Sequence, residues 1–242
     1  MKAFEIASVL EEFAPVLLQE SWDNSGFSVG DPEKEVSSAI VALDCTPELV
    51  DEAIESGSGL IITHHPLIFK VIKIITGKTN VERMIVKLIK NDIIVYSAHT
   101  NIDTVVNGVS GSMADKLDLT DRDILVKSAD GITGLGIIGN LKKAVTYEEL
   151  IKLVKEKFGL NNLKCSTPLP GKISKVAVCG GSGSSLIDAA KSQGASVYIT
   201  GDIGHFESEL GVLDIITSIL RKKIPTFAVR KSENIYNPIY YY

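Results

Sequence analysis

Short apolar runs that alternate with amphipathic helical segments are the feature that most constrains the fold of this chain. The runs at residues 38–43 (SAIVAL), 60–63 (LIIT) and 93–96 (IIVY) contain few polar side chains, as is typical of strands buried on both faces of a sheet. Helical periodicity separates them at residues 47–56 and 80–90. This alternation predicts an α/β fold with mainly parallel sheets.

The strand–helix–strand unit occurs twice in the chain. The segment VALDCTPELVDEAIESGSGLIIT, from Val41, aligns with VAVCGGSGSSLIDAAKSQGASVYIT, from Val176, which has a turn two residues longer. The repeat predicts two related αβ lobes, which we place at residues 1–127 and 128–242. The residues that recur at a constant offset are Leu49, Asp51, Ala53, Gly57, Ile62 and Thr63, matched by Leu186, Asp188, Ala190, Gly194, Ile199 and Thr200.

Two of the predicted helices carry recognisable start signals. Thr46 precedes Pro47, which suits an N-cap followed by proline at the first helical position. Thr146 and Glu149 are three residues apart, the spacing of a capping box, so a second helix is expected from there to Phe158. The N-terminal segment also fits an amphipathic helix.

Composition and charge exclude several classes of protein. Hydrophobic residues make up 45% of the 242 and charged residues 23%, which argues against disorder. The net charge of -5 argues against a bulk cationic surface for nucleic acid. The apolar run at residues 67–75 is too short to span a membrane and is interrupted by Lys70 and Lys73.

Cysteine usage indicates the compartment. Cys45, Cys165 and Cys179 are scattered, odd in number and without C-x-x-C spacing. This pattern predicts thiols rather than disulfides, as in a reducing compartment.

Glutamates interrupt the N-terminal segment, which therefore does not have the pattern of a signal peptide. We expect a cytoplasmic protein with no membrane partner.

All four histidines lie just after a predicted strand or in a polar loop. His64 and His65 close the LIIT strand, His99 follows the IVYSA strand, and His205 lies in GHFESE. Adjacent residues of an extended strand point in opposite directions, so His64 and His65 converge only if the chain turns there, and Pro66 favours such a turn. A hydrogen-bonded structural role is the alternative for any one of them.

Two of the histidines have a carboxylate four residues further on. Asp103 follows His99 and Glu209 follows His205 at this spacing, which brings each pair to one face of a helical turn. Imidazole and carboxylate without thiolate suit Zn, Fe or Mn, and carboxylates can bridge two ions. Taken singly, each carboxylate is also typical of a solvated group or a helix cap.

Two further motifs have two interpretations each. The turn at residues 180–184 (GGSGS) between a strand and a helix can hold a phosphate or be a tight connection. Trp22 can stack on a base or fill the core. We take Trp22 and Asn24 as candidate substrate-binding residues.

Five segments together resemble one known family. SWDNSGFSVG, VALDCTPELVDEAI, LIITHHPLIF, YSAHTNID and DIGHFESE are similar to the YbgI/YqfO-type dinuclear-metal proteins, also called NGG-interacting factor three-like, and the likeness runs from the first helix to the tail. The resemblance implies two αβ lobes that face a shared metal site, two divalent ions (Zn, Fe or Mn) and a toroidal homohexamer. The implied metal ligands are His64, His65, Asp103, His205 and Glu209, with Glu209 as a bridge.

Some members of this family are labelled GTP cyclohydrolase I type 2. That label implies a metal-dependent hydrolase in which an activated water attacks C8 of the guanine ring, towards dihydroneopterin triphosphate. His99 is then the candidate catalytic residue, as a general acid or base near the substrate. The alternative is a non-catalytic, metal-binding hexameric scaffold or a regulatory protein that binds a partner.

The chain departs from the family pattern in two places. Only a short link joins Leu125 to Gly131, where many relatives carry an inserted middle domain. The motif at residues 200–202 (TGD) runs directly into Ile203, without the histidine-containing stretch that the family tends to have there. The second lobe is therefore expected to lack a strand-sized segment.

Overall fold

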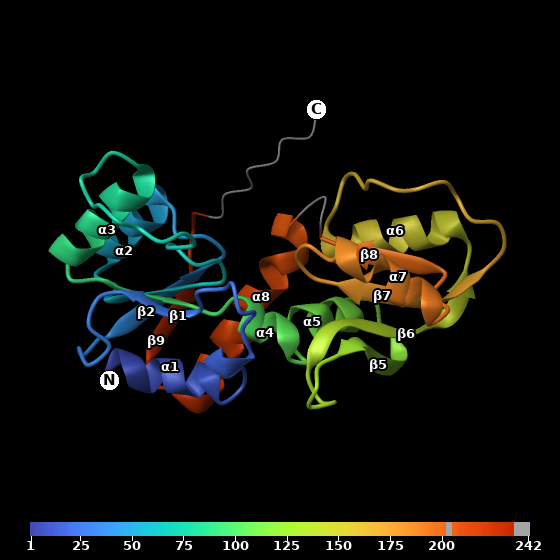
Figure 1. Cartoon of the computed structure of the whole chain (residues 1–242), viewed down its shortest axis with the longest axis horizontal. Coiled ribbons are helices and arrows are strands. Elements are labelled where there is room, and N and C mark those ends of the chain that lie inside the picture. The colour runs from blue at the N-terminus through green and yellow to red at the C-terminus, as the bar shows by residue number, and fades with distance from the viewer. Residues whose placement is uncertain (202–204, 235–242) are drawn as a thin grey trace. The chain divides into compact units, whose positions relative to one another are not determined.

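The computed structural model describes residues 1–201 and 205–234, and the chain folds into two units (Figure 1). Unit 1 contains Met1–Ile102 and the described residues that follow Gly211. Unit 2 contains Asp103–Gly211. The two-lobed α/β fold that the sequence predicts is confirmed.

Unit 1 is built on a five-stranded sheet in the order β1-β4-β3-β2-β9. Its parallel core consists of β2 (Ser38–Ala42), β3 (Leu60–Thr63) and β4 (Ile94–Ser97), and β9 (Ala228–Lys231) extends it in parallel beside β2. The edge strand β1 (Gly26–Val29) pairs with β4 in the antiparallel direction. Every residue of β3 and β4 is buried, which explains their continuous apolar sequences.

Helices cover both faces of this sheet (Figure 1). Helices α2 (Pro47–Ser56) and α3 (Asn80–Lys90) pack on one face, and α1 (Ala3–Glu11) lies on the other with the unit 1 part of α8 (His205–Lys223). A short 3-10 helix, η1 (Val16–Leu18), follows α1.

The start and end of α2 follow the sequence signals. The Thr46 side chain accepts a hydrogen bond from the Leu49 amide, and Pro47 opens the helix. The helix ends at Gly57, whose φ of 67° is a left-handed conformation that glycine adopts without a Cβ clash. Thr146 and Glu149 likewise form the predicted capping box at the start of a later helix.

Unit 2 is built on a four-stranded sheet in the order β5-β6-β7-β8. Its strands are β5 (Thr120–Lys127), β6 (Gly134–Val145), β7 (Ile173–Cys179) and β8 (Val197–Thr200). Only β7 and β8 are parallel; β5, β6 and β7 form an antiparallel meander. The prediction of parallel strands therefore holds for the repeated unit. It does not extend to β5 and β6, which pair in the antiparallel direction.

The helices of unit 2 range from a single 3-10 turn to a helix of 12 residues. They are α5 (Val109–Lys116), α6 (Tyr147–Phe158), the 3-10 helix η2 (Ser184–Leu186) and α7 (Ile187–Ser192). Helix α4 (Thr100–Thr104) begins in unit 1 and ends in unit 2.

The internal repeat is visible in the strand register. Val41 of β2 lies opposite Ile62 of β3, and Val178 of β7 lies opposite Ile199 of β8. These two pairs are related by the same sequence offset as the recurring residues, so the two copies share one strand–helix–strand geometry. The repeat is confirmed as a structural unit.

The two units do not follow the continuous halves 1–127 and 128–242. Strand β5, from the expected first lobe, pairs with β6 in unit 2, and β9, from the expected second lobe, pairs with β2 in unit 1. The chain therefore passes from unit 1 to unit 2 after Ile102 and back after Gly211. Sequence periodicity identifies strands but does not indicate which sheet an isolated terminal strand joins.

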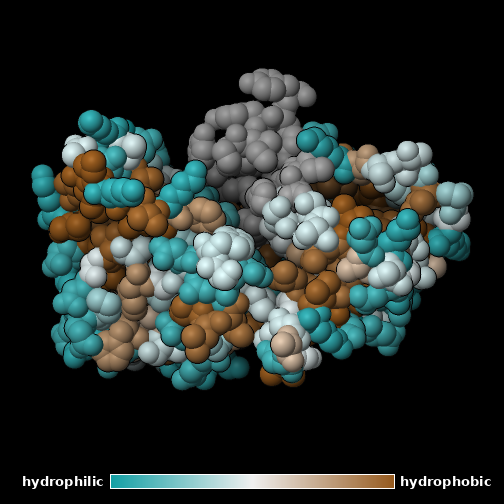
Figure 2. Space-filling model, in the orientation of Figure 1, coloured by the Kyte–Doolittle hydropathy of each residue, from teal (hydrophilic) through white to brown (hydrophobic). Residues whose placement is uncertain are grey.

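Hydrophobic groups are exposed on the face shown in Figure 2, including over α3 and the loop that precedes it. Val71, Ile74 and Ile75 of this loop are 90%, 68% and 51% exposed, whereas Leu67 at the start of the run packs into the core. Within the described residues, no helix has both the length and the apolar character needed to cross a membrane. No disulfide occurs in the described part of the chain, in agreement with the sequence, and burial raises the pKa of the Cys45 thiol to about 12.

Candidate metal centre

Three of the four histidines lie together at the carboxyl edge of the unit 1 sheet. His64 and His65 follow β3 directly, and His99 follows β4. Because β3 and β4 are parallel, with Thr63 opposite Ser97, the two strands end side by side. The chain bends at His64 and His65 and leaves the sheet, as Pro66 predicts.

The imidazole rings of these residues form one cluster, which we call the histidine cluster (His64, His65 and His99). Ring centroids are 4.9 Å apart for His64 and His65, 5.2 Å for His64 and His99, and 5.5 Å for His65 and His99. One nitrogen from each ring lies within 4.8 Å of the others. His64 is fully buried, whereas the other two are half-buried.

The Nδ1 atom of every ring in the cluster is hydrogen-bonded to an oxygen. His64 Nδ1 lies 2.8 Å from the Ala98 carbonyl, which can only accept, so His64 Nδ1 carries the proton and the ring lone pair is on Nε2. His65 Nδ1 lies 2.8 Å from Asp44 Oδ1, and His99 Nδ1 lies 2.7 Å from Asp23 Oδ1. Metal-binding histidines are oriented in this way, so the residues present fit a divalent ion.

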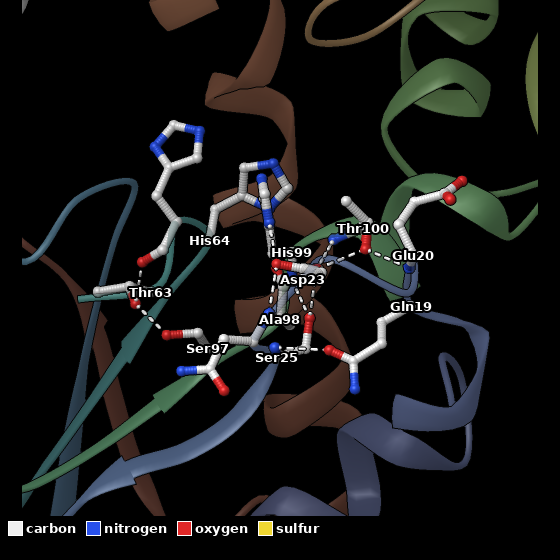
Figure 3. Close-up of polar contacts among 12 residues, drawn as sticks. Gln19, Glu20, Asp23, Ser25, Thr63, His64, Ser97, Ala98, His99 and Thr100 are labelled. Carbon is white, nitrogen blue, oxygen red and sulfur yellow. Dashed lines mark hydrogen bonds and ion pairs between the residues drawn. The ribbon is translucent and has the colours of Figure 1, made fainter. Parts of the chain in front are cut away.

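Asp23 is the centre of a buried hydrogen-bond network beside His99 (Figure 3). Its side chain is fully buried, and it accepts hydrogen bonds from the Thr100 amide at 3.0 Å and from the Thr100 hydroxyl. The Asn24 amide and the Ser25 hydroxyl donate to it at 2.7 and 3.0 Å. Burial would raise the pKa of this carboxyl, but the hydrogen bonds from His99 and Thr100 outweigh burial and hold the pKa well below its usual range.

A second small network fixes the ends of β3 and β4. Thr63 Oγ1 donates to the His65 carbonyl at 2.8 Å and lies 2.9 Å from Ser97 Oγ (Figure 3). Both hydroxyls are buried, so they lock the turn at His64 and His65 from inside the sheet.

The other predicted ligands lie elsewhere in the chain. Asp103 belongs to α4 and to the part of the chain in unit 2. His205 and Glu209 belong to α8, but their side chains lie outside the described residues. Their roles as ligands stay predictions.

Trp22 and Asn24 occupy the turn that carries Asp23. Trp22 is 58% exposed, so the interpretation that it fills the core is wrong. The Asn24 side-chain amide donates to the Ile68 carbonyl at 2.7 Å, so its NH₂ group makes a hydrogen bond within the protein.

The glycine turn after β7 is explained by its own packing. A Cβ on Gly183 would lie 2.2 Å from the Tyr198 hydroxyl oxygen, and one on Gly180 would lie 2.3 Å from Val109 Cγ1. The Gly183 amide donates to Thr200 Oγ1, and the Gly180 amide donates to Ser110 Oγ. Of the two interpretations, the structure favours a tight connection between strand and helix.

Sequence reasoning missed the two carboxylates that orient the cluster. Asp44 follows β2, the neighbour of β3 in the sheet, so its position just after a strand was an available signal. Asp23 lies in an irregular turn 76 residues before its partner His99, and no local pattern links the two.

Comparisons with known proteins identify the family. The model of the Duf34/NIF3 (NGG1p interacting factor 3) family matches residues 1–208. A Clostridium perfringens protein named "GTP cyclohydrolase 1 type 2 homolog" is 39% identical, and the match covers 93% of each chain. A Streptococcus pneumoniae protein of the same name is 39% identical over 84% of this chain and 77% of its own.

Solved structures agree with this assignment. A Bacillus cereus protein described as related to NIF3 superposes with a TM-score of 0.90 at 25% identity, covering 100% of this chain and 99% of its own. Reduced HcgD from Methanocaldococcus jannaschii has a TM-score of 0.82 at 28% identity, covering 96% and 98%.

Some relatives are longer than this chain. The alignment with a Bacillus subtilis protein, also named "GTP cyclohydrolase 1 type 2 homolog", extends over 305 positions at 25% identity, yet it covers only 82% of this chain and 82% of the relative. That relative therefore contains segments that this chain lacks. On the match of the family model and the identity to these relatives, the chain belongs to the Duf34/NIF3 (NGG1p interacting factor 3) family.

Proposed function

We propose that this protein is a metal-dependent hydrolase that acts on a nucleotide. The observation that carries the proposal is the histidine cluster, in which each Nδ1 is hydrogen-bonded to an oxygen and the rings converge. A purely structural histidine needs no such convergence with two others.

The centre would hold two divalent ions, of Zn, Fe or Mn. His64 and His65 would be its ligands through Nε2, because their Nδ1 atoms are hydrogen-bonded, and the family resemblance adds Asp103, His205 and Glu209. The absence of thiolate and the presence of imidazole fit these metals. A divalent ion in such a site acts as a Lewis acid and makes water a usable nucleophile near neutral pH.

His99 moves the proton in this proposal. Asp23 fixes the ring through Nδ1, as a buried carboxylate orients the histidine of a catalytic pair, so Nε2 is the atom that exchanges a proton with substrate or water. Because Thr100 also donates to Asp23, the carboxylate keeps its charge and its position.

The substrate is a nucleotide such as GTP. Support comes from the name that the relatives carry, "GTP cyclohydrolase 1 type 2 homolog". The cytoplasm is the proposed location, supported by the cysteine pattern.

Metal content and GTP turnover, measured on the same preparations, test this function. We expect two ions per chain in the wild type and their loss in His65→Ala and Glu209→Ala. We expect His99→Ala to keep its ions while turnover falls roughly 10²–10⁴-fold, the usual contribution of a general acid or base. Asp51→Ala, an exposed carboxylate on α2, is the matched control and should change neither quantity.

Three results would revise the proposal in different ways. Turnover that survives chelation would contradict a metal-dependent reaction. Loss of ions in His99→Ala would make His99 a ligand instead of the proton-transfer group. Two tightly bound ions without turnover on any nucleotide would identify the non-catalytic scaffold.

A further inference from the structure

Two exposed aromatic side chains, Trp22 and Phe69, stand beside the histidine cluster; we call them the aromatic rim. Trp22 is 58% exposed and Phe69 is 52% exposed. Their ring centroids are 5.8 Å apart, and they lie 6.2 and 6.3 Å from the His99 ring. The three rings therefore form one contiguous group that ends at the proposed proton-transfer residue.

The rim is held in place by hydrogen bonds on both sides. The side chain of Asp23, which follows Trp22, is fully buried in the network with His99 and Thr100. The Asn24 side chain donates to the carbonyl of Ile68, the residue before Phe69. The turn that carries Trp22 and the segment that carries Phe69 are thus tied to each other and to the cluster, without any ligand.

Exposed aromatic rings in this position require a physical reason. Burying large apolar side chains away from water lowers the free energy, so their exposure is unfavourable. Paired aromatic rings at a surface next to a polar cluster are typical of a binding site. The Trp22 and Phe69 rings are inclined by 56°, so a planar heterocycle stacked on one ring would contact the other at an angle, beside His99. Lys70, which follows Phe69, is exposed and offers a cation on the same segment for phosphate groups.

We infer that the aromatic rim binds the planar base of a free nucleotide by stacking, with Trp22 and Phe69 as contact residues and Asn24 as the positioning residue. This inference rests on the proposed function, because the nucleotide bound at the rim would be the substrate of the adjacent histidine cluster. A free nucleotide is favoured over nucleic acid because the net charge is -5. Stacking on a ring face accepts any purine, so GTP and ATP should bind with similar affinity.

Trp22 is the only tryptophan of the chain, so its fluorescence reports on this site directly. We would titrate the full-length protein with GTP, with ATP, and with ribose 5-phosphate plus inorganic triphosphate as the probe without a base. Excitation at the red edge of tryptophan absorption avoids absorption by the purine. Quenching by GTP and ATP but not by the baseless probe is the expected result.

Matched variants separate stacking from general hydrophobic contact. Phe69→Tyr keeps the ring and should bind GTP within about twofold of the wild type. Phe69→Leu keeps apolar volume but loses the ring and should weaken binding roughly 5- to 100-fold. Asn24→Asp cannot donate to the Ile68 carbonyl and should also weaken binding. Ile89→Ala, at an exposed apolar position on α3, is the control and should bind as the wild type does.

The outcomes distinguish this inference from the proposed function. Equal GTP affinity in Phe69→Leu and Phe69→Tyr would overturn it, as would quenching by the baseless probe. Tighter binding of a guanine-containing single-stranded hexanucleotide, falling steeply with salt, would overturn the assignment to a free nucleotide. Metal content measured in parallel should be unchanged in Phe69→Leu. A wild type that binds metal but shows no quenching would refute the rim and leave the metal centre intact.

Discussion

At the scale of single residues, the two carboxylates that orient the cluster differ mainly in burial. Asp23 is fully buried and has four hydrogen-bonding neighbours, whereas the side chain of Asp44 is 51% exposed and contacts His65 from the surface. When a buried carboxylate is replaced, the buried donors around it are left without an acceptor. When an exposed carboxylate is replaced, water can accept those hydrogen bonds instead.

We therefore predict unequal effects for Asp23→Asn and Asp44→Asn. Asp23→Asn should lower the free energy of unfolding by about 2–4 kcal/mol, because an amide NH₂ would face donors that now point at a carboxylate. Asp44→Asn should lower it by less than about 1 kcal/mol. Urea denaturation of the metal-free proteins measures both, and equal effects would show that the Asp23 network does not stabilise the fold.

At the scale of elements, Glu52 joins α2 to the segment after β9. Its carboxylate pairs with Arg230 and accepts hydrogen bonds from the Ser232 hydroxyl and from the backbone amides of Glu233 and Asn234. Burial would raise the pKa of Glu52, but these hydrogen bonds outweigh it and lower the pKa to about 2. The last described strand is therefore fastened by pairing with β2 and by one side chain of α2.

The pH dependence of stability should reveal this contact. The folded-state pKa lies below the unfolded one, so the Glu52 contribution is present above about pH 4.5 and is lost as the pH falls towards 2. Glu52→Gln should cost about 1–3 kcal/mol at pH 7 and progressively less below pH 4. Urea denaturation across this range tests it, with Glu55→Gln, an exposed neighbour on α2, as the control. A cost independent of pH would mean that the charge of Glu52 is not what holds the segment.

Elements with strong local signals are predictable from this sequence. Helix α3 (Asn80–Lys90) and strand β3 (Leu60–Thr63) have the predicted bounds, because periodicity and capping residues agree there. The histidine cluster is also predictable, since parallel strands bring their ends together. The antiparallel strands β5 and β6 are not, because their pairing depends on contacts that no short window contains.

The residues around the site show the same limit. Asp23 is hydrogen-bonded to His99, and the ring of Phe69 lies beside that of Trp22. In both pairs the two residues are far apart in the sequence. Hydrophobic pattern assigns Phe69 to an apolar run and says nothing about its exposure. Long-range hydrogen bonds such as that from Asn24 to Ile68 determine which side chains meet.

At the scale of the whole molecule, we propose a homohexamer, which the family resemblance implies. The exposed apolar side chains of Val71, Ile74 and Ile75 are of the kind that subunit contacts bury. Light scattering coupled to size-exclusion chromatography should give about six times the 26.1 kDa mass of the chain. The mass should not change on tenfold dilution, and a mass of one chain would contradict the proposal.

The double passage of the chain between units has a consequence for synthesis on the ribosome. Among the described residues, unit 2 is the continuous stretch Asp103–Gly211, whereas the unit 1 sheet needs β9, which pairs with β2 about 190 residues upstream. Chains emerge from the N-terminus, and loop closure over such a distance is slow. The N-terminal part of unit 1, Met1–Ile102, therefore has its apolar strand β2 unpaired on one edge until β9 has been synthesised. The histidine cluster is translated before unit 2, but the sheet that supports it is completed only after unit 2 and β9 have been made.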